Sequence, residues 1–164
     1  MRTQSRNCRA ASLFLSLILG WTAHGFSAGL KIGLSYGEIT SYLSNVITLQ
    51  RSSPVDDQPR YMGLSADKLS MLEVIGDKSN ITQATLGIGV PNDSPSVLAR
   101  NSALVLRFVK NATPGWSKST DWTVAAIRKA AATEKPVETT YGSRRITMTF
   151  IKPLGMIMVT VKHK

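Results

Sequence analysis

Residues 81–109, ITQATLGIGVPNDSPSVLARNSALVLRFV, decide the fold, because their apolar residues change from one spacing to another. In the first part, apolar residues such as Leu86 and Ile88 alternate with glycine or polar residues, as in a strand with one buried face. In the second part, an apolar stripe at helical spacing runs from Pro95 to Val109. The stretch therefore predicts a half-buried strand followed by an amphipathic helix.

The helix that follows this strand has clear start and stop signals. Asp93 or Ser94 is expected to cap it, and Pro114 ends it. Asn101 falls inside the apolar stripe, where a polar group without a partner costs about 1–3 kcal/mol. We therefore expect Asn101 to be satisfied by a strand backbone or by a buried water, rather than to line a pocket.

The rest of the chain divides into short strands and two further helices. An amphipathic helix is expected over 38–51, a proline-containing loop over 51–60, and a helix over 122–133 that buries Val124, Ile127 and Ala131. Alternating apolar residues and turn signals predict six strands. They cover residues 61–65, 69–75, 81–90, 137–141, 145–151 and 155–162.

The resulting order, α-βββ-αα-βββ, predicts an α+β fold with helices packed on one face of an antiparallel sheet. Each half offers a helical segment followed by a three-stranded meander, which is compatible with an internal duplication. The two halves share too few residues for the sequence alone to establish a repeat.

The first 28 residues have the layout of a secretory signal peptide. Three arginines (Arg2, Arg6 and Arg9) precede an apolar run over 10–23, which is shorter than the ~20 residues that span a bilayer. Small residues favour cleavage between 25 and 28. Residues 29–164 then form one exported domain, periplasmic or extracellular, that lacks the only cysteine, Cys8.

The charge of this expected mature chain is unevenly distributed. Residues 29–93 hold 5 basic and 7 acidic residues, whereas residues 94–164 hold 12 basic and 3 acidic residues. An excess of this size says little about fold but bears on partners. Export disfavours nucleic acid, and the mature chain is expected to have no transmembrane segment. The expected partners are therefore an anionic lipid or polysaccharide of the envelope, or an acidic protein.

Basic residues of the second half are the candidate binding residues, since arginine and lysine suit phosphate and carboxylate groups. They are Arg100, Arg107, Lys110, Lys118, Arg128, Lys129, Arg144 and Arg145. Arg100 and Arg107 are expected to lie two turns apart on one helix face, opposite the apolar stripe. The alternative is that these residues are scattered over a solvated surface.

Trp116 and Trp122 flank a polar loop and are further candidates. Exposed, they would suit ring stacking or sugar binding; the alternative is that they pack a helix corner onto the sheet.

Catalytic chemistry has little support in the sequence. The sequence predicts no cofactor, no metal site of the usual Cys and His kinds, and no catalytic residue. The leading hypothesis is a small non-catalytic binding or accessory protein that uses its basic half against an anionic partner. The alternatives are a structural subunit of an envelope assembly and an envelope hydrolase that works through Asp56, Asp57 or Asp121.

Export makes a first testable prediction. We expect residues 1 to about 25 to be absent from the mature protein. The intact mass or the N-terminal sequence of the exported protein checks this. Recovery of the full 17.8 kDa chain from the envelope would instead indicate an uncleaved anchor.

Overall fold

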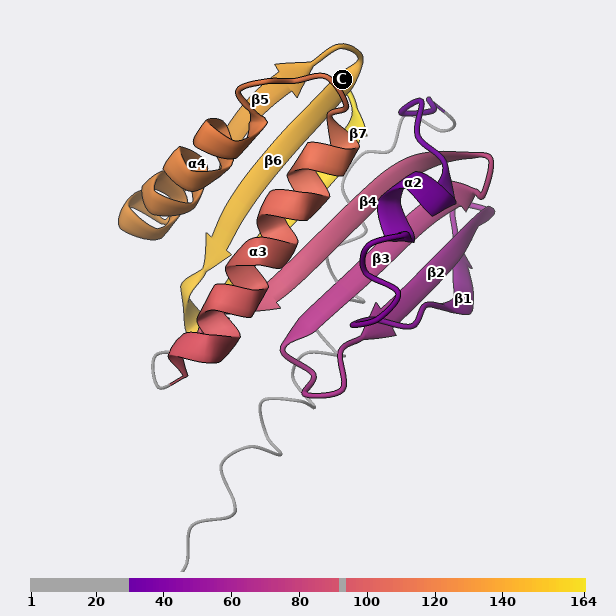
Figure 1. Ribbon diagram of the computed structural model, residues 1–164. Helices are drawn as coiled ribbons and strands as arrows, with labels where there is room; N and C mark the ends of the chain where they lie inside the picture. Colours follow the sequence, from indigo (N-terminus) through magenta and orange to yellow (C-terminus); the bar gives the residue numbers. More distant parts are fainter. Residues whose placement is uncertain (1–29, 92–93) are drawn as a thin grey trace, which may run out of the picture.

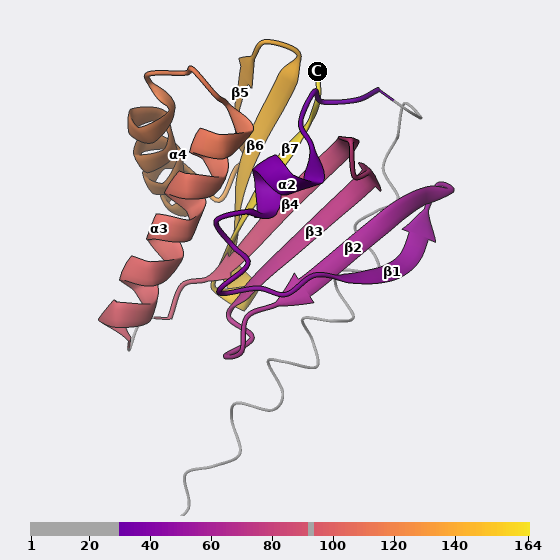
Figure 2. The same ribbon diagram turned by 45° about the vertical axis from the view of Figure 1, so that its right-hand side comes forward.

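The computed structural model describes residues 30–91 and 94–164 as a seven-stranded antiparallel sheet with its helices on one face (Figures 1 and 2). The α+β class is confirmed, and the order of elements matches the expected one apart from one additional strand, β1, in the first half. The expected signal peptide and Asp93 lie outside the described residues. The strands are β1 (Gln50–Val55), β2 (Gln58–Leu64), β3 (Ser70–Asp77), β4 (Asn80–Gly89), β5 (Val137–Tyr141), β6 (Arg144–Ile151) and β7 (Met156–His163).

The helices divide the sheet between them. The short α2 (Tyr36–Thr40) and the long α3 (Pro95–Ala112) lie over the middle strands, and α4 (Ser119–Thr133) lies over β5 and β6 (Figure 1). A 3-10 turn, η1 (Lys152–Leu154), connects β6 to β7. Ser94 is the N-cap residue of α3, as expected, but its side chain makes no capping hydrogen bond.

The strand order β1-β2-β3-β4-β7-β6-β5 places two meanders back to back. The meander β2-β3-β4 and the meander β5-β6-β7 meet where β4 pairs with β7. Their order across this junction is mirrored, as an internal duplication would give, and the duplication itself stays a prediction.

The core lies between the helices and one face of the sheet. Leu86, Val159 and Met148 are neighbours in one cross-strand row and are fully buried beneath α3, which contributes Phe108. Because side chains alternate along a strand, the residues next to them in sequence lie on the opposite face.

The prediction of a helix over 38–51 is mostly wrong. The helix α2 spans five residues, and turns follow it to Val46 before β1 begins at Gln50. Ile39 and Leu43 are nonetheless buried, since successive turns repeat the four-residue spacing of a helix. The segment between them and β1 is rich in serine, threonine and asparagine, which are weak helix formers.

The prediction of a loop over 51–60 is also wrong, because β1 and the start of β2 form a hairpin there. Asp56 and Asp57 have φ of 47° and 61°, the left-handed values that both central residues of a type I′ turn adopt. Pro54 is tolerated because β1 is an edge strand and its register shifts between Ser52 and Val55.

The buried face of α4 differs from the prediction. Val124 is 37 % exposed and Ala131 is exposed, while Ile127 packs partly against the core. The helix instead buries Ser119, Thr123, Ala126 and Ala130. Burial of Thr123 is possible because its hydroxyl donates a 2.7 Å hydrogen bond to the Ser119 carbonyl.

Gly63 in β2 is a close crossing point of two chain segments. The backbone at Ile47 and Thr48 passes so near that a Cβ on Gly63 would collide with the Thr48 carbonyl and lie 2.8 Å from the Ile47 side chain. An antiparallel bridge between Ile47 and Ser65 holds the crossing in place.

The variant Gly63→Ala should therefore lower the free energy of unfolding by about 2 kcal/mol or more, since a backbone must move to admit one methyl group. Thermal or denaturant unfolding measures this. Gly37→Ala is the matched control, because the nearest atom to its Cβ is 4.0 Å away and the position is helical. Equal stability of the two variants would contradict a close crossing.

Candidate functional site

Helices α3 and α4 and the turn between them carry five exposed basic residues. Each lies away from the buried stripe of its own helix or in the turn between the helices. These residues are Arg107, Lys110, Lys118, Arg128 and Lys129. Within the described residues none of them forms an ion pair, and Asp121 is the one acidic residue between positions 95 and 133. We take these five residues as the candidate site and call them the basic face.

Arg100 is left out of the basic face because, although its side chain is 39 % exposed, it has partners within the protein. Its guanidinium forms a 2.6 Å ion pair with Asp67 in the β2–β3 turn and donates to the Asn101 side-chain oxygen at 2.9 and 3.1 Å. Burial alone would raise the pKa of Asp67. Hydrogen bonds from Ser65, Leu69 and Arg100 outweigh burial and lower that pKa.

Asn101 is fully buried and satisfied by a strand backbone, as expected. Its amide nitrogen donates to the Gly89 carbonyl at 2.8 Å, and its oxygen accepts from the Ser70 hydroxyl at 3.1 Å. The side chain thus joins α3 to β3 and β4. Its role in the described structure is to hold the helix on the sheet.

Arg144 is also used inside the fold. Its guanidinium donates to the carbonyls of Ile32, Gly33 and Ala112 at 2.8, 2.9 and 2.8 Å. Ala112 ends α3, where unpaired carbonyls and the helix dipole favour a positive charge. Partial burial lowers the pKa of Arg144, and the nearby Glu38 carboxylate opposes that effect.

Arg145 lies on the face of the sheet opposite the helices. The next residue, Ile146, is fully buried on the helix side, as is Met148. In the pairing of β6 with β7, Arg145 lies opposite Lys162, so two residues of like charge are neighbours on this face. The structure therefore does not bring Arg100, Arg107, Arg144 and Arg145 to one surface.

Trp116 and Trp122 pack a helix corner onto the sheet. Their ring centroids are 5.8 Å apart, and Trp116 stacks on Tyr141 of β5 with centroids 5.6 Å apart. The Tyr141 hydroxyl donates to the Pro114 carbonyl at 3.1 Å. Both tryptophans are partly buried against the core, so the packing interpretation accounts for them.

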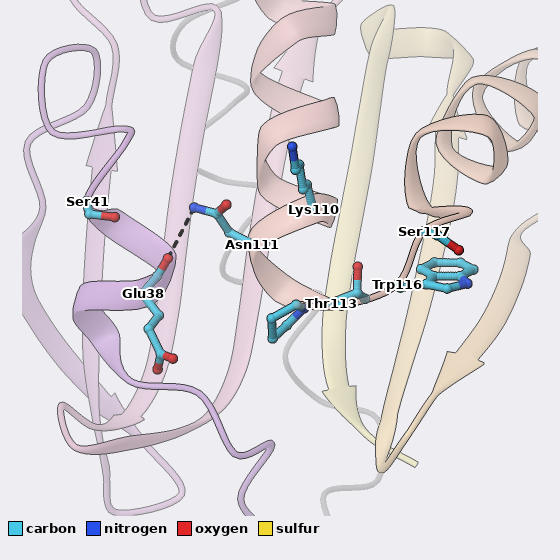
Figure 3. A pocket seen from close by; sticks show the side chains of 9 residues that line it. Glu38, Ser41, Lys110, Asn111, Thr113, Trp116 and Ser117 are labelled. Carbon is cyan, nitrogen blue, oxygen red and sulfur yellow. Dashed lines mark hydrogen bonds between the residues drawn. The ribbon is translucent and has the colours of Figure 1, made fainter.

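A groove of about 620 Å³ opens at the C-terminal end of α3, between α2 and the α3–α4 turn (Figure 3). It is lined by Glu38, Ser41, Lys110, Asn111, Thr113, Pro114, Gly115, Trp116 and Ser117. Lys110 belongs to the basic face, so the groove continues that surface.

Glu38 is the acidic residue of this groove, and it was not among the site residues predicted from the sequence. Its carboxylate accepts hydrogen bonds of 2.7 Å from both the backbone N–H and the hydroxyl of Ser35. These bonds hold the pKa of Glu38 below its ordinary value, so the group is charged at neutral pH. The sequence signal was the spacing Ser35-x-x-Glu38 of a capping box.

The three carboxylates proposed for a hydrolase lie in two separate parts of the fold. Asp56 and Asp57 form the turn beside the edge strand β1, whereas Asp121 is on α4, over the opposite edge of the sheet (Figure 1). In the part of the chain that the structure describes, no three His, Cys, Asp or Glu side chains are grouped to hold a metal ion. None of the described helices is both long enough and apolar enough to cross a membrane.

Comparison of the chain with models of known protein families, with curated proteins and with solved structures gave no match.

The variant Asn101→Leu should lower the free energy of unfolding by about 1–3 kcal/mol, because the Gly89 carbonyl and the Ser70 hydroxyl lose a buried partner. Chemical denaturation measures this. Asn111→Leu on the same helix is the control, since Asn111 is only half-buried and makes one long hydrogen bond of 3.4 Å. Loss of ligand binding in Asn101→Leu at unchanged stability would contradict a structural role.

Proposed function

We propose that this protein is an exported, non-catalytic binding protein that attaches to an anionic surface of the cell envelope through its basic face. The observation that carries the proposal is the set of five exposed cations on α3, on α4 and in the turn between them, with Asp121 as the one acidic residue between positions 95 and 133. An excess of positive charge attracts phosphate and carboxylate groups and speeds association with them.

The distinction between free and internally used cations supports this assignment. Arg100 and Arg144 have protein partners that account for them without any ligand. The residues of the basic face make no such contacts within the described chain. Their charge is therefore available to a partner outside the domain.

The N-terminal sequence supports an envelope location and hence the kind of partner. Residues 1–28 read as a signal peptide, so the anionic surfaces that the mature protein would meet are lipid headgroups and charged polysaccharides. The groove beside Lys110 offers hydroxyl and amide groups from Ser41, Asn111 and Ser117, which would contact such a partner next to the basic face.

Co-sedimentation with lipid vesicles tests the proposal. We expect the protein to bind vesicles containing phosphatidylglycerol at low ionic strength and to be released above about 0.15 M salt, where the Debye length falls to ~8 Å. The double variant Arg107→Ala, Lys110→Ala should bind at least about tenfold more weakly, since each cation near an anionic surface contributes about 1 kcal/mol.

Two controls separate charge from other effects. Lys31→Ala, Arg51→Ala removes the same charge from exposed positions outside the basic face and should bind like the unmodified protein. Vesicles of phosphatidylcholine alone measure any binding by the apolar N-terminal run. Equal loss in both double variants, or binding that ignores salt, would contradict attachment through the basic face.

A further inference from the structure

Three methionines surround a glycine on the face of the sheet opposite the helices. Gly87 in β4 pairs directly with Met71 in β3 on one side and with Met158 in β7 on the other. Their neighbours Leu72, Leu86 and Val159 point into the helix-side core, so this row points the other way.

The side chains of Met71 and Met156 pack over Gly87, in the space that a side chain at this position would occupy. A Cβ on Gly87 would lie 2.7 Å from Met71 Cγ, 3.3 Å from Met71 Sδ and 3.4 Å from Met156 Cε. Met156 is two residues from Met158 on the same strand and face. The sulfur of Met71 and the methyl group of Met156 therefore meet above Gly87, and Met158 is paired with Gly87 beside them.

The surroundings favour a soft metal ion over a hard one. Met71 and Met156 are 1 % and 3 % exposed, and Met158 is half-buried, which leaves an approach from its side. The buried carboxylate on this face, Glu73, is held by the Arg60 guanidinium at 2.6 Å and is thus neutralised. Thioether sulfur is neutral and polarisable, and it selects Cu(I) over Mg²⁺, Ca²⁺ or Mn²⁺.

We propose that Met71, Met156 and Met158 form a binding site for a soft monovalent metal ion, Cu(I). The site is independent of the basic face and lies on the other side of the sheet. The expectation of no metal site rested on the scarcity of cysteine and histidine, and thioether ligands fall outside that argument.

The distribution of methionine over the two faces of the sheet supplies a control. Of the five methionines in the described residues, Met62, Met71, Met156 and Met158 lie on this face. The fifth, Met148, is buried on the helix side. Leucine replaces methionine at nearly constant volume, so Met→Leu variants keep their packing while losing the sulfur.

Anaerobic competition against a chromophoric Cu(I) chelator tests the proposal, with ascorbate as the reductant that keeps copper monovalent. All variants carry Cys8→Ser, because a thiolate binds Cu(I) by itself. The Cys8→Ser protein should take one equivalent of Cu(I). Met71→Leu, Met158→Leu should bind at least about 30-fold more weakly, and Met148→Leu should bind like the parent protein.

A second probe locates the metal. With methyl-¹³C-labelled methionine, Ag(I) as an air-stable soft ion should shift the methyl resonances of Met71, Met156 and Met158 and leave that of Met148 in place. Failure of the Cys8→Ser protein to compete for Cu(I), or equal weakening by Met148→Leu, would overturn the proposal. Circular dichroism of the metal-free variants checks that each has kept its fold.

Discussion

The pairing of β4 with β7 is the constraint on which the rest of the architecture depends. Seven residue pairs, from Gln83–Lys162 to Gly89–Met156, join the two meanders, and no other pair of described strands connects them. The helix-side row at this junction, with Leu86 against Val159, gives α3 its apolar platform. The opposite row, with Gly87 against Met158, forms the methionine cluster, so one register determines both faces.

Two polar side chains, one fully buried and one partly buried, hold α3 to this sheet at its two ends. Asn101 joins the first half of the helix to β3 and β4, and Arg144 joins its last carbonyl to β6 and to the segment at Ile32 and Gly33. Both make several hydrogen bonds in places where an unsatisfied group would be costly. This internal use of polar groups leaves the other cations of α3 and α4 free for the solvent side.

Much of the fold could be predicted from the sequence, because the strands of both meanders and the long α3 have strong periodicity and clear turn signals. The structure of the first 25 described residues could not be predicted, since the spacing of Ile39 and Leu43 fits either a helix or a series of turns. The hairpin at Asp56 was hidden by two prolines that an edge strand and a register shift accommodate. The candidate site was predicted in part: the charge excess was visible, but the partner of Arg100, Asp67, lies 33 residues away in sequence.

The three hydrogen bonds of Arg144 also bear on when the chain folds. They connect residues as far as 112 positions apart, and the β4–β7 pairing likewise joins distant segments. Such contacts close large loops, and chains dominated by them fold slowly. Backbone hydrogen bonds to Ile81 hold the segment at Ile32 on β4, but its contacts with Arg144 need β6, and β4 keeps an open edge until β7 pairs with it. Both sets of contacts can therefore form only once nearly all of the described sequence is present.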